Sequence, residues 1–146
     1  SNKPLGAGVT HGGVQSTILN LARETTNATS TVLSSDNTAA STDNQLVLLN
    51  NSAIAFKGTC IAGVTGGGNT KAWEFRGAIK RGANAASTTL VGSVIKDVLA
   101  YDAGAAAWDV DFTADTTNGA IKVEVTGQAS NTIRWVCKIE TTELAF

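Results

Sequence analysis

Apolar and charged residues alternate strictly along four segments of the C-terminal half, namely 73–80, 108–112, 121–125 and 133–140. Successive side chains of a β-strand point to opposite faces of a sheet, so each segment predicts a strand with one buried face and one exposed face. Gly, Asn and Thr turns separate the segments. Together these features predict an all-β fold, an antiparallel β-sandwich or jelly roll.

The same reading extends the sandwich to about eight strands, which is the usual number for a jelly roll. They are expected at residues 28–34, 45–49, 53–64, 71–81, 88–101, 107–114, 120–126 and 132–144. Gly66, Gly67 and Gly68 predict a hairpin turn between two of these strands, and Gly92 predicts a bend in 88–101. The order in which the strands pair does not follow from the pattern.

The N-terminal residues read differently, so we divide the chain into a stem end or linker at 1–27 and a β knob at 28–146. Residues 1–13 are rich in glycine. Ile18, Leu21 and Ala22 follow at helical spacing, and Ser16 is suited to cap a helix. We therefore expect a short helix within 14–24.

Composition narrows the classes of partner. The chain has 146 residues, 15 Gly, 1 Pro and a net charge of −1, so it offers no basic field for nucleic acid or an anionic membrane. No apolar run approaches the ~20 residues that span a bilayer. Trp73, Trp108 and Trp135 take inner-face positions by alternation, so we expect them in the core and not as sugar-stacking platforms. Tyr101 is the aromatic residue expected at the surface.

The sequence gives little support for a catalytic site or a metal site. His11 is the sole histidine and lies in the glycine-rich leader, far from any nucleophile motif. Asp109 and Asp111 share one strand face, and Glu124 follows on the next strand, an arrangement open to a metal or to glycoside hydrolysis. Lys122 shares that face, so a mixed-charge surface is the simpler interpretation. We expect no catalytic residue, no metal and no cofactor.

Cys60 and Cys137 both fall on the apolar side of an alternating strand. Neither has the CxxC spacing of a zinc site. The interpretation is two small buried thiols, and a disulfide between neighbouring strands stays open.

Five cations fall at outer positions of two predicted strands: Arg76, Lys80 and Arg81 on one, Arg134 and Lys138 on the other. If the two strands were neighbours, these cations would form a patch facing Glu74 and Glu140. Cross-strand or intersubunit ion pairs are one interpretation. The other is a ligand site for a carboxylate or an acidic sugar, because guanidinium forks match carboxylates.

Three stretches of sequence together resemble a known family: 44–56, 72–81, and 114–119 leading to 133–136. The family is the C-terminal domain at the tips of tailed-bacteriophage tail fibres, tailspikes and tail needles, and the resemblance covers roughly residues 44–144. It implies a homotrimeric knob, similar to tumour-necrosis-factor-like jelly rolls, carried on a fibrous stem. Ile18, Leu21 and Ala22 would then lie at a three-fold axis.

The resemblance implies a virion protein, made in the bacterial host cytoplasm, that attaches to the cell surface or assists genome delivery. It implies no catalysis. The expected partners are two further copies and a bacterial surface receptor, glycan or protein, or a small acidic ligand in the crevices between subunits. Apolar residues on both faces of 88–101 favour cover by a neighbouring subunit. The alternatives are a monomeric carbohydrate-binding module and a glycan hydrolase using Asp109 and Asp111.

Overall fold

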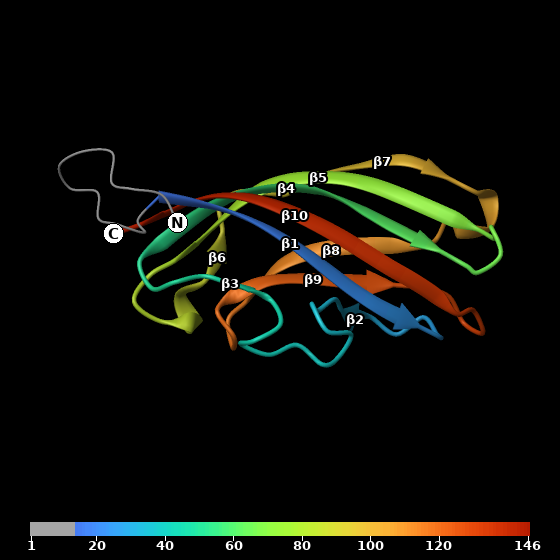
Figure 1. The fold of residues 1–146 in the computed structure, drawn as a ribbon, viewed down its shortest axis with the longest axis horizontal. Coiled ribbons are helices and arrows are strands. Elements are labelled where there is room, and N and C mark those ends of the chain that lie inside the picture. Colours follow the sequence, from blue (N-terminus) through green and yellow to red (C-terminus); the bar gives the residue numbers. More distant parts are fainter. Residues whose placement is uncertain (1–13) are drawn as a thin grey trace.

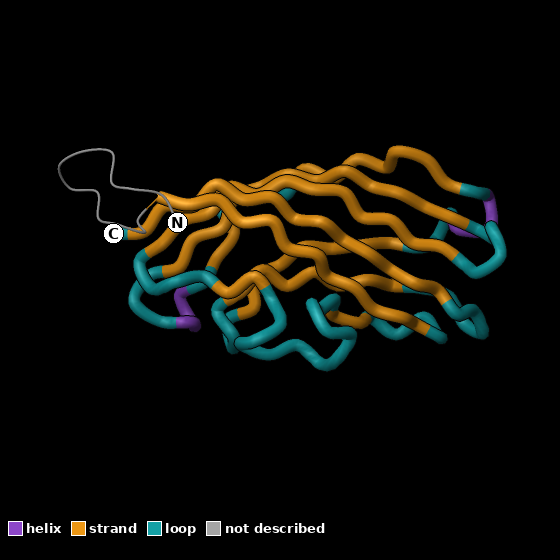
Figure 2. Tube along the Cα trace, viewed as in Figure 1, coloured by secondary structure: helices purple, strands orange, loops and turns teal. Residues whose placement is uncertain are grey.

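Two antiparallel β-sheets packed face to face make up the computed structural model, which describes residues 14–146 (Figures 1 and 2). The expected linker at 1–13, with His11, lies outside the described residues. Two short 3₁₀ turns, Ala85–Ser87 and Ala103–Ala105, are the helical segments of the described chain. The predicted antiparallel β-sandwich is therefore confirmed.

The larger sheet, sheet A, contains both the first and the last strand of the described chain. Its strands are β1 (Val14–Thr25), β10 (Ile133–Ala145), β4 (Ser52–Gly63), β5 (Thr70–Arg81), β6 (Thr89–Leu90) and β7 (Ile95–Tyr101). They lie in the order β1-β10-β4-β5, and both β6 and β7 pair with β5. In Figure 1 the blue β1 runs beside the red β10.

The smaller sheet, sheet B, is built around one hairpin. Its strands are β8 (Asp109–Asp115), β9 (Ala120–Thr126), β2 (Thr31–Val32) and β3 (Leu46–Val47). β8 pairs with one side of β9, while β2 and β3 also pair with β9. The strands expected at 28–34 and 45–49 are thus much shorter than predicted, and the remaining residues of those segments lie outside the paired strands.

Glycines set the turns that the sequence predicts. Gly66 and Gly67 have φ of 74° and 69° in the β4–β5 turn, and Gly119 has φ of 69° between β8 and β9. Positive φ is strained for other residues and free of that penalty for glycine. Gly92, with φ of 69°, breaks the expected long strand 88–101 into β6 and β7. The predicted bend there is confirmed.

Aromatic side chains fill the space between the sheets. Trp73, Trp108 and Trp135 are at most 1% exposed, as alternation predicts. The Trp73 and Trp135 rings stack with centroids 5.8 Å apart, and the Phe75 ring of sheet A lies 4.3 Å from that of Phe112 in sheet B. Burying large aromatic rings supplies much of the apolar area in a core that has few of them.

The expected helix within 14–24 is wrong, because these residues form strand β1, paired with β10 along its whole length. Leu21 is buried and Leu19 packs against the core, whereas Ile18 is 66% exposed. The period-two pair Leu19 and Leu21 therefore prevails over the helical spacing of Ile18 and Leu21. Residues 14–25 belong to the β-sandwich and not to a separate stem, which also corrects the division at 27/28.

Candidate binding face on sheet A

The outer face of sheet A is organised in rows that cross the strands. Strand register places one outward residue of each strand beside that of the next. One row runs through Ile18, Glu140, Lys57, Arg76 and Ile95, from β1 to β7. Cross-strand neighbours of this kind interact directly, so the row acts as one surface.

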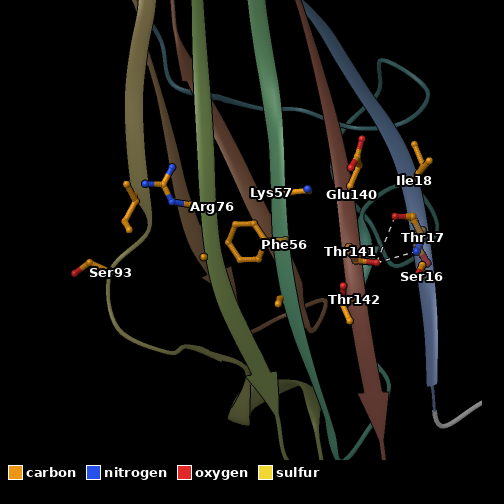
Figure 3. A pocket seen from close by; sticks show the side chains of 13 residues that line it. Ser16, Thr17, Ile18, Phe56, Lys57, Arg76, Ser93, Glu140, Thr141 and Thr142 are labelled. Carbon is orange, nitrogen blue, oxygen red and sulfur yellow. Dashed lines mark hydrogen bonds between the residues drawn. The ribbon is translucent and has the colours of Figure 1, made fainter. Parts of the chain in front are cut away.

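This row lies along an open hollow of about 740 Å³ on the outer face. Figure 3 shows Ile18, Glu140, Lys57 and Arg76 on four successive strands, with Thr142 further along the strand of Glu140. Charges therefore occupy the middle of the hollow, and isoleucine side chains occupy its two ends.

A second row is apolar from one side of the sheet to the other. It consists of Ala22, Val136, Ile61, Ala72 and Ala100. Val136 is 46% exposed and Ile61 is 49% exposed. Most outer faces of antiparallel sheets are polar, so a continuous apolar row is suited to contact with another surface.

The five predicted ligand-binding cations do not form one patch. Strand β4 lies between β5 and β10, so the condition that these two strands be neighbours is not met. Arg134 and Lys80 stand near opposite ends of the sheet, in line with Gly63 and Ala53 of β4. The physical reason is that β4, already paired with β5 in a hairpin, also pairs with β10 through long-range contacts that alternation does not encode.

Arg76 and Lys138 come nearer the middle of the face. Arg76 lies in the row of Glu140, and Lys138 lies in the row of Glu74, each with one β4 residue between them. The expected patch facing Glu74 and Glu140 is therefore not formed across adjacent strands, because β4 stands between each cation and the acid of its row. Lys138 also pairs with Glu140 at 3.1 Å within its own strand.

Arg81 points away from this face. Its guanidinium donates hydrogen bonds to the Leu48 carbonyl at 2.8 Å and to Asn50 Oδ1 at 2.9 Å. It also lies against Gly119, where a Cβ would come within 2.1 Å of Arg81. Arg81 thus ties loops of the sandwich together and is committed to that role.

Lys57 is the residue of the hollow that the sequence reading missed. It occupies an outward position of β4, at the centre of the charged row. Within residues 14–146, Lys57, Glu74 and Lys80 make no ion pair, so the outer face presents unpaired charges of both signs. Alternation along 53–64 could have found Lys57, because Phe56, Gly58 and Cys60 mark the opposite face.

Three acids of sheet B are paired with lysines. Lys96 Nζ of β7 lies 2.7 Å from Asp109 Oδ1 and 3.3 Å from Asp111 Oδ1, and Lys122 pairs with Glu124 at 3.5 Å. Burial acts to lower the pKa of Lys96, but the two carboxylates outweigh burial and raise it above its ordinary value. These contacts match the mixed-charge interpretation.

Exposed apolar side chains are distributed unequally between the sheets. Of the large apolar residues exposed in 14–146, eight lie on strands of sheet A and none on strands of sheet B. The eight are Ile18, Ile61, Ile95, Val98, Leu99, Tyr101, Val136 and Leu144. Four of them belong to β7, an edge strand whose backbone is open to pairing.

The described part of the chain shows neither a metal-site geometry nor a membrane-spanning helix. No group of three His, Cys, Asp or Glu side chains in 14–146 is arranged around a metal position. No helix there has the length and apolar composition needed to cross a membrane. Tyr101 and Phe146 are the exposed aromatic rings of these residues, 57% and 91% exposed.

No known protein-family model matches this sequence, and no curated protein matches it significantly. Fold and site together therefore define the class: an antiparallel β-sandwich whose larger sheet carries a partly apolar, partly charged outer face.

Proposed function

We propose that this chain is the non-enzymatic, homotrimeric tip of a bacteriophage tail appendage, acting in host-surface attachment or penetration or in genome delivery. The outer face of sheet A is its contact surface between copies. A bacterial surface glycan or protein, or a small acidic ligand, binds in the crevices that assembly creates.

The observation that carries this proposal is the apolar row through Val136 and Ile61, which lies uncovered on a single chain. Contiguous exposed apolar surface in a soluble protein is typical of an interaction site. The unpaired Glu74 lies in the next row of this face and the unpaired Lys57 in the row after that, so charges of both signs are available to pair between copies.

The segments 44–56, 72–81, and 114–119 leading to 133–136, which resemble phage tail tips, support the biological role. They contribute Arg76, Ala72 and Val136 to the two outward rows of sheet A. The alternative is a monomeric carbohydrate-binding module. Because all three tryptophans are buried, they offer no surface on which a sugar could stack.

Solution mass by light scattering on a sizing column tests the trimer. We expect a mass near three chains, and Val136→Glu with Ile61→Glu should lower it to one chain, because two acids would be buried in an apolar contact. Thr113→Glu, on an exposed position of sheet B, is the matched control and should leave the mass unchanged.

Each outcome separates one part of the proposal from another. A parent protein that elutes as a monomer contradicts the trimer. A double variant that stays trimeric, with native circular dichroism, removes sheet A as the interface and leaves the trimer standing. Loss of mass in the sheet B control would show that the effect is not specific to the face.

Attachment is tested with an array of bacterial surface polysaccharides. The parent protein should bind an acidic polysaccharide, and Arg76→Ala and Lys80→Ala should each weaken that binding several-fold while the mass stays unchanged. Arg81→Lys is no suitable control, because Arg81 holds Leu48 and Asn50. Equal binding by the parent and both alanine variants would contradict the cationic contribution.

A further inference from the structure

Two cysteines face each other at the centre of sheet A. Cys60 of β4 is the direct register partner of Cys137 of β10. Both thiols are free, and both side chains are 0% exposed. The pair thus belongs to the inner face, and its position is independent of the outer-face contacts on which the proposed function rests.

The strand geometry suits a covalent bond between them. Directly opposite residues of antiparallel strands have Cα atoms about 4.5–5.5 Å apart, within the ~4.4–6.8 Å that disulfides span. Contact with the Cys60 thiol, together with burial, raises the pKa of Cys137. The two sulfur atoms are therefore neighbours already in the reduced protein.

We propose that Cys60 and Cys137 are a disulfide site that joins β4 to β10 when the chain folds in an oxidising medium. The oxidant is a small disulfide such as oxidised glutathione. One cysteine thiolate attacks it, forms a mixed disulfide and releases one reduced glutathione. The second thiolate then attacks the protein sulfur of that mixed disulfide and releases the second, so two thiol protons and two electrons leave the protein.

Burial determines when this exchange takes place. A thiolate is the attacking species, and a raised pKa together with a sealed position suppress it in the folded chain. The bond therefore forms during folding or after local opening, before β4 and β10 close over the sulfur atoms. The same burial then shields the finished bond from reductants.

The bond should stabilise the sandwich, because it closes a long loop of the unfolded chain between two strands at the middle of sheet A. A disulfide near tryptophan also quenches its emission. Trp73 is the register partner of Cys60 on β5, and Trp135 shares the inner face of β10 with Cys137. Fluorescence thus reports the bond through residues that take no part in it.

Refolding from urea in oxidised or reduced glutathione tests the site. The oxidised sample should lose two hydrogen atoms in mass, yield one cross-linked peptide containing both cysteines, and emit less tryptophan fluorescence. Its melting temperature should rise by roughly 10 °C above that of the reduced sample. Cys60→Ala is the matched control, since Cys137 alone can form only adducts with glutathione or another chain.

Two results would overturn the proposal. One is an oxidised sample in which both cysteines still react with a thiol reagent after unfolding, or in which cross-links join only separate chains. The other is an intramolecular bond that lowers the melting temperature, which would show that the strands must distort to make it. Because the parent protein supplies both samples, the result does not depend on the folding of any variant.

Discussion

The two sheets of this sandwich share a core but differ on their outer faces. The outer face of sheet B is polar, with Asp109 and Asp111 paired to Lys96 and Glu124 paired to Lys122. Sheet A shows apolar rows, and several of its charges lack partners within the described chain. If both outer faces contacted only water, both would be expected to be polar.

The contrast teaches that alternation and exposure carry different information. Alternation tells which side chains face the core, and the long strands of both sheets follow it, whereas β7 of sheet A is exposed at nearly every position. The polarity of the outward side chains then distinguishes a sheet that faces solvent from one that contacts another surface. If sheet A assembles as we propose, one of its faces serves folding and the other serves assembly, and substitutions on its two faces should have effects of different size and kind.

The largest expected effect lies on the inner face of sheet A. Trp135→Ala removes a ring that is 0% exposed and packs within 5.8 Å of Trp73 and 6.1 Å of Trp108. It should lower the free energy of unfolding by about 3–5 kcal/mol. Urea denaturation followed by circular dichroism measures it.

The neighbouring outward residue provides the control. Val136→Ala should cost less than about 1 kcal/mol in the single chain, because its side chain is 46% exposed. Similar losses for Trp135→Ala and Val136→Ala would contradict the division of sheet A into a folding face and a contact face.

A smaller effect is expected where β1 meets the core. Trp135 Nε1 donates a hydrogen bond of 2.9 Å to Thr25 Oγ1, and both residues are buried. Thr25→Val keeps the shape but leaves the indole N–H without its acceptor, which should cost about 1–3 kcal/mol in urea denaturation. Thr26→Val, one residue further and exposed, should change little; an equal loss there would remove the hydrogen bond as the cause.

The sequence predicts the inner faces well because strand alternation is local. Trp73, Trp108 and Trp135 are all assigned to the core, and the Gly66–Gly67 turn is placed between the right strands. The N-terminal segment is the failure. Ile18 and Leu21 fit a helix, and only pairing with β10, more than a hundred residues away, makes that segment a strand.

The binding face could be predicted less well, because it depends on strand order. Arg76 and Lys138 are read as outward residues, yet their separation by β4 follows from long-range pairing. Alternation could have identified Lys57, but the sequence reading missed it. The role of Lys96 could not be found in this way, since nothing local indicates that β7 reaches across to Asp109 and Asp111 of sheet B.

The next prediction concerns the pH dependence of the ion pairs that Lys96 makes with Asp109 and Asp111 of sheet B. Because the pKa of Lys96 is raised in the folded chain, its contribution to stability is complete below its unfolded pKa and is lost as pH rises through its folded pKa. The difference in unfolding free energy between the parent and Lys96→Met should therefore shrink above about pH 10.5. Because both acids are partly exposed, the difference in unfolding free energy should not exceed about 1 kcal/mol. A difference that stays constant from pH 8 to pH 12 would contradict the ion-pair origin.

The smallest expected effect is on the outer face of sheet A. Arg76 lies 3.7 Å from Asp97, and both side chains are 59% exposed. Arg76→Gln should change the free energy of unfolding by less than about 0.5 kcal/mol, because solvent screens such a pair. Arg76→Gln should be measured in the Val136→Glu, Ile61→Glu double variant, which we expect to be a monomer, so that assembly does not contribute to urea denaturation. A loss of several times that size in the single chain would mean that the charged row holds sheet A together, and the outer face would then share the folding role now given to the inner face alone.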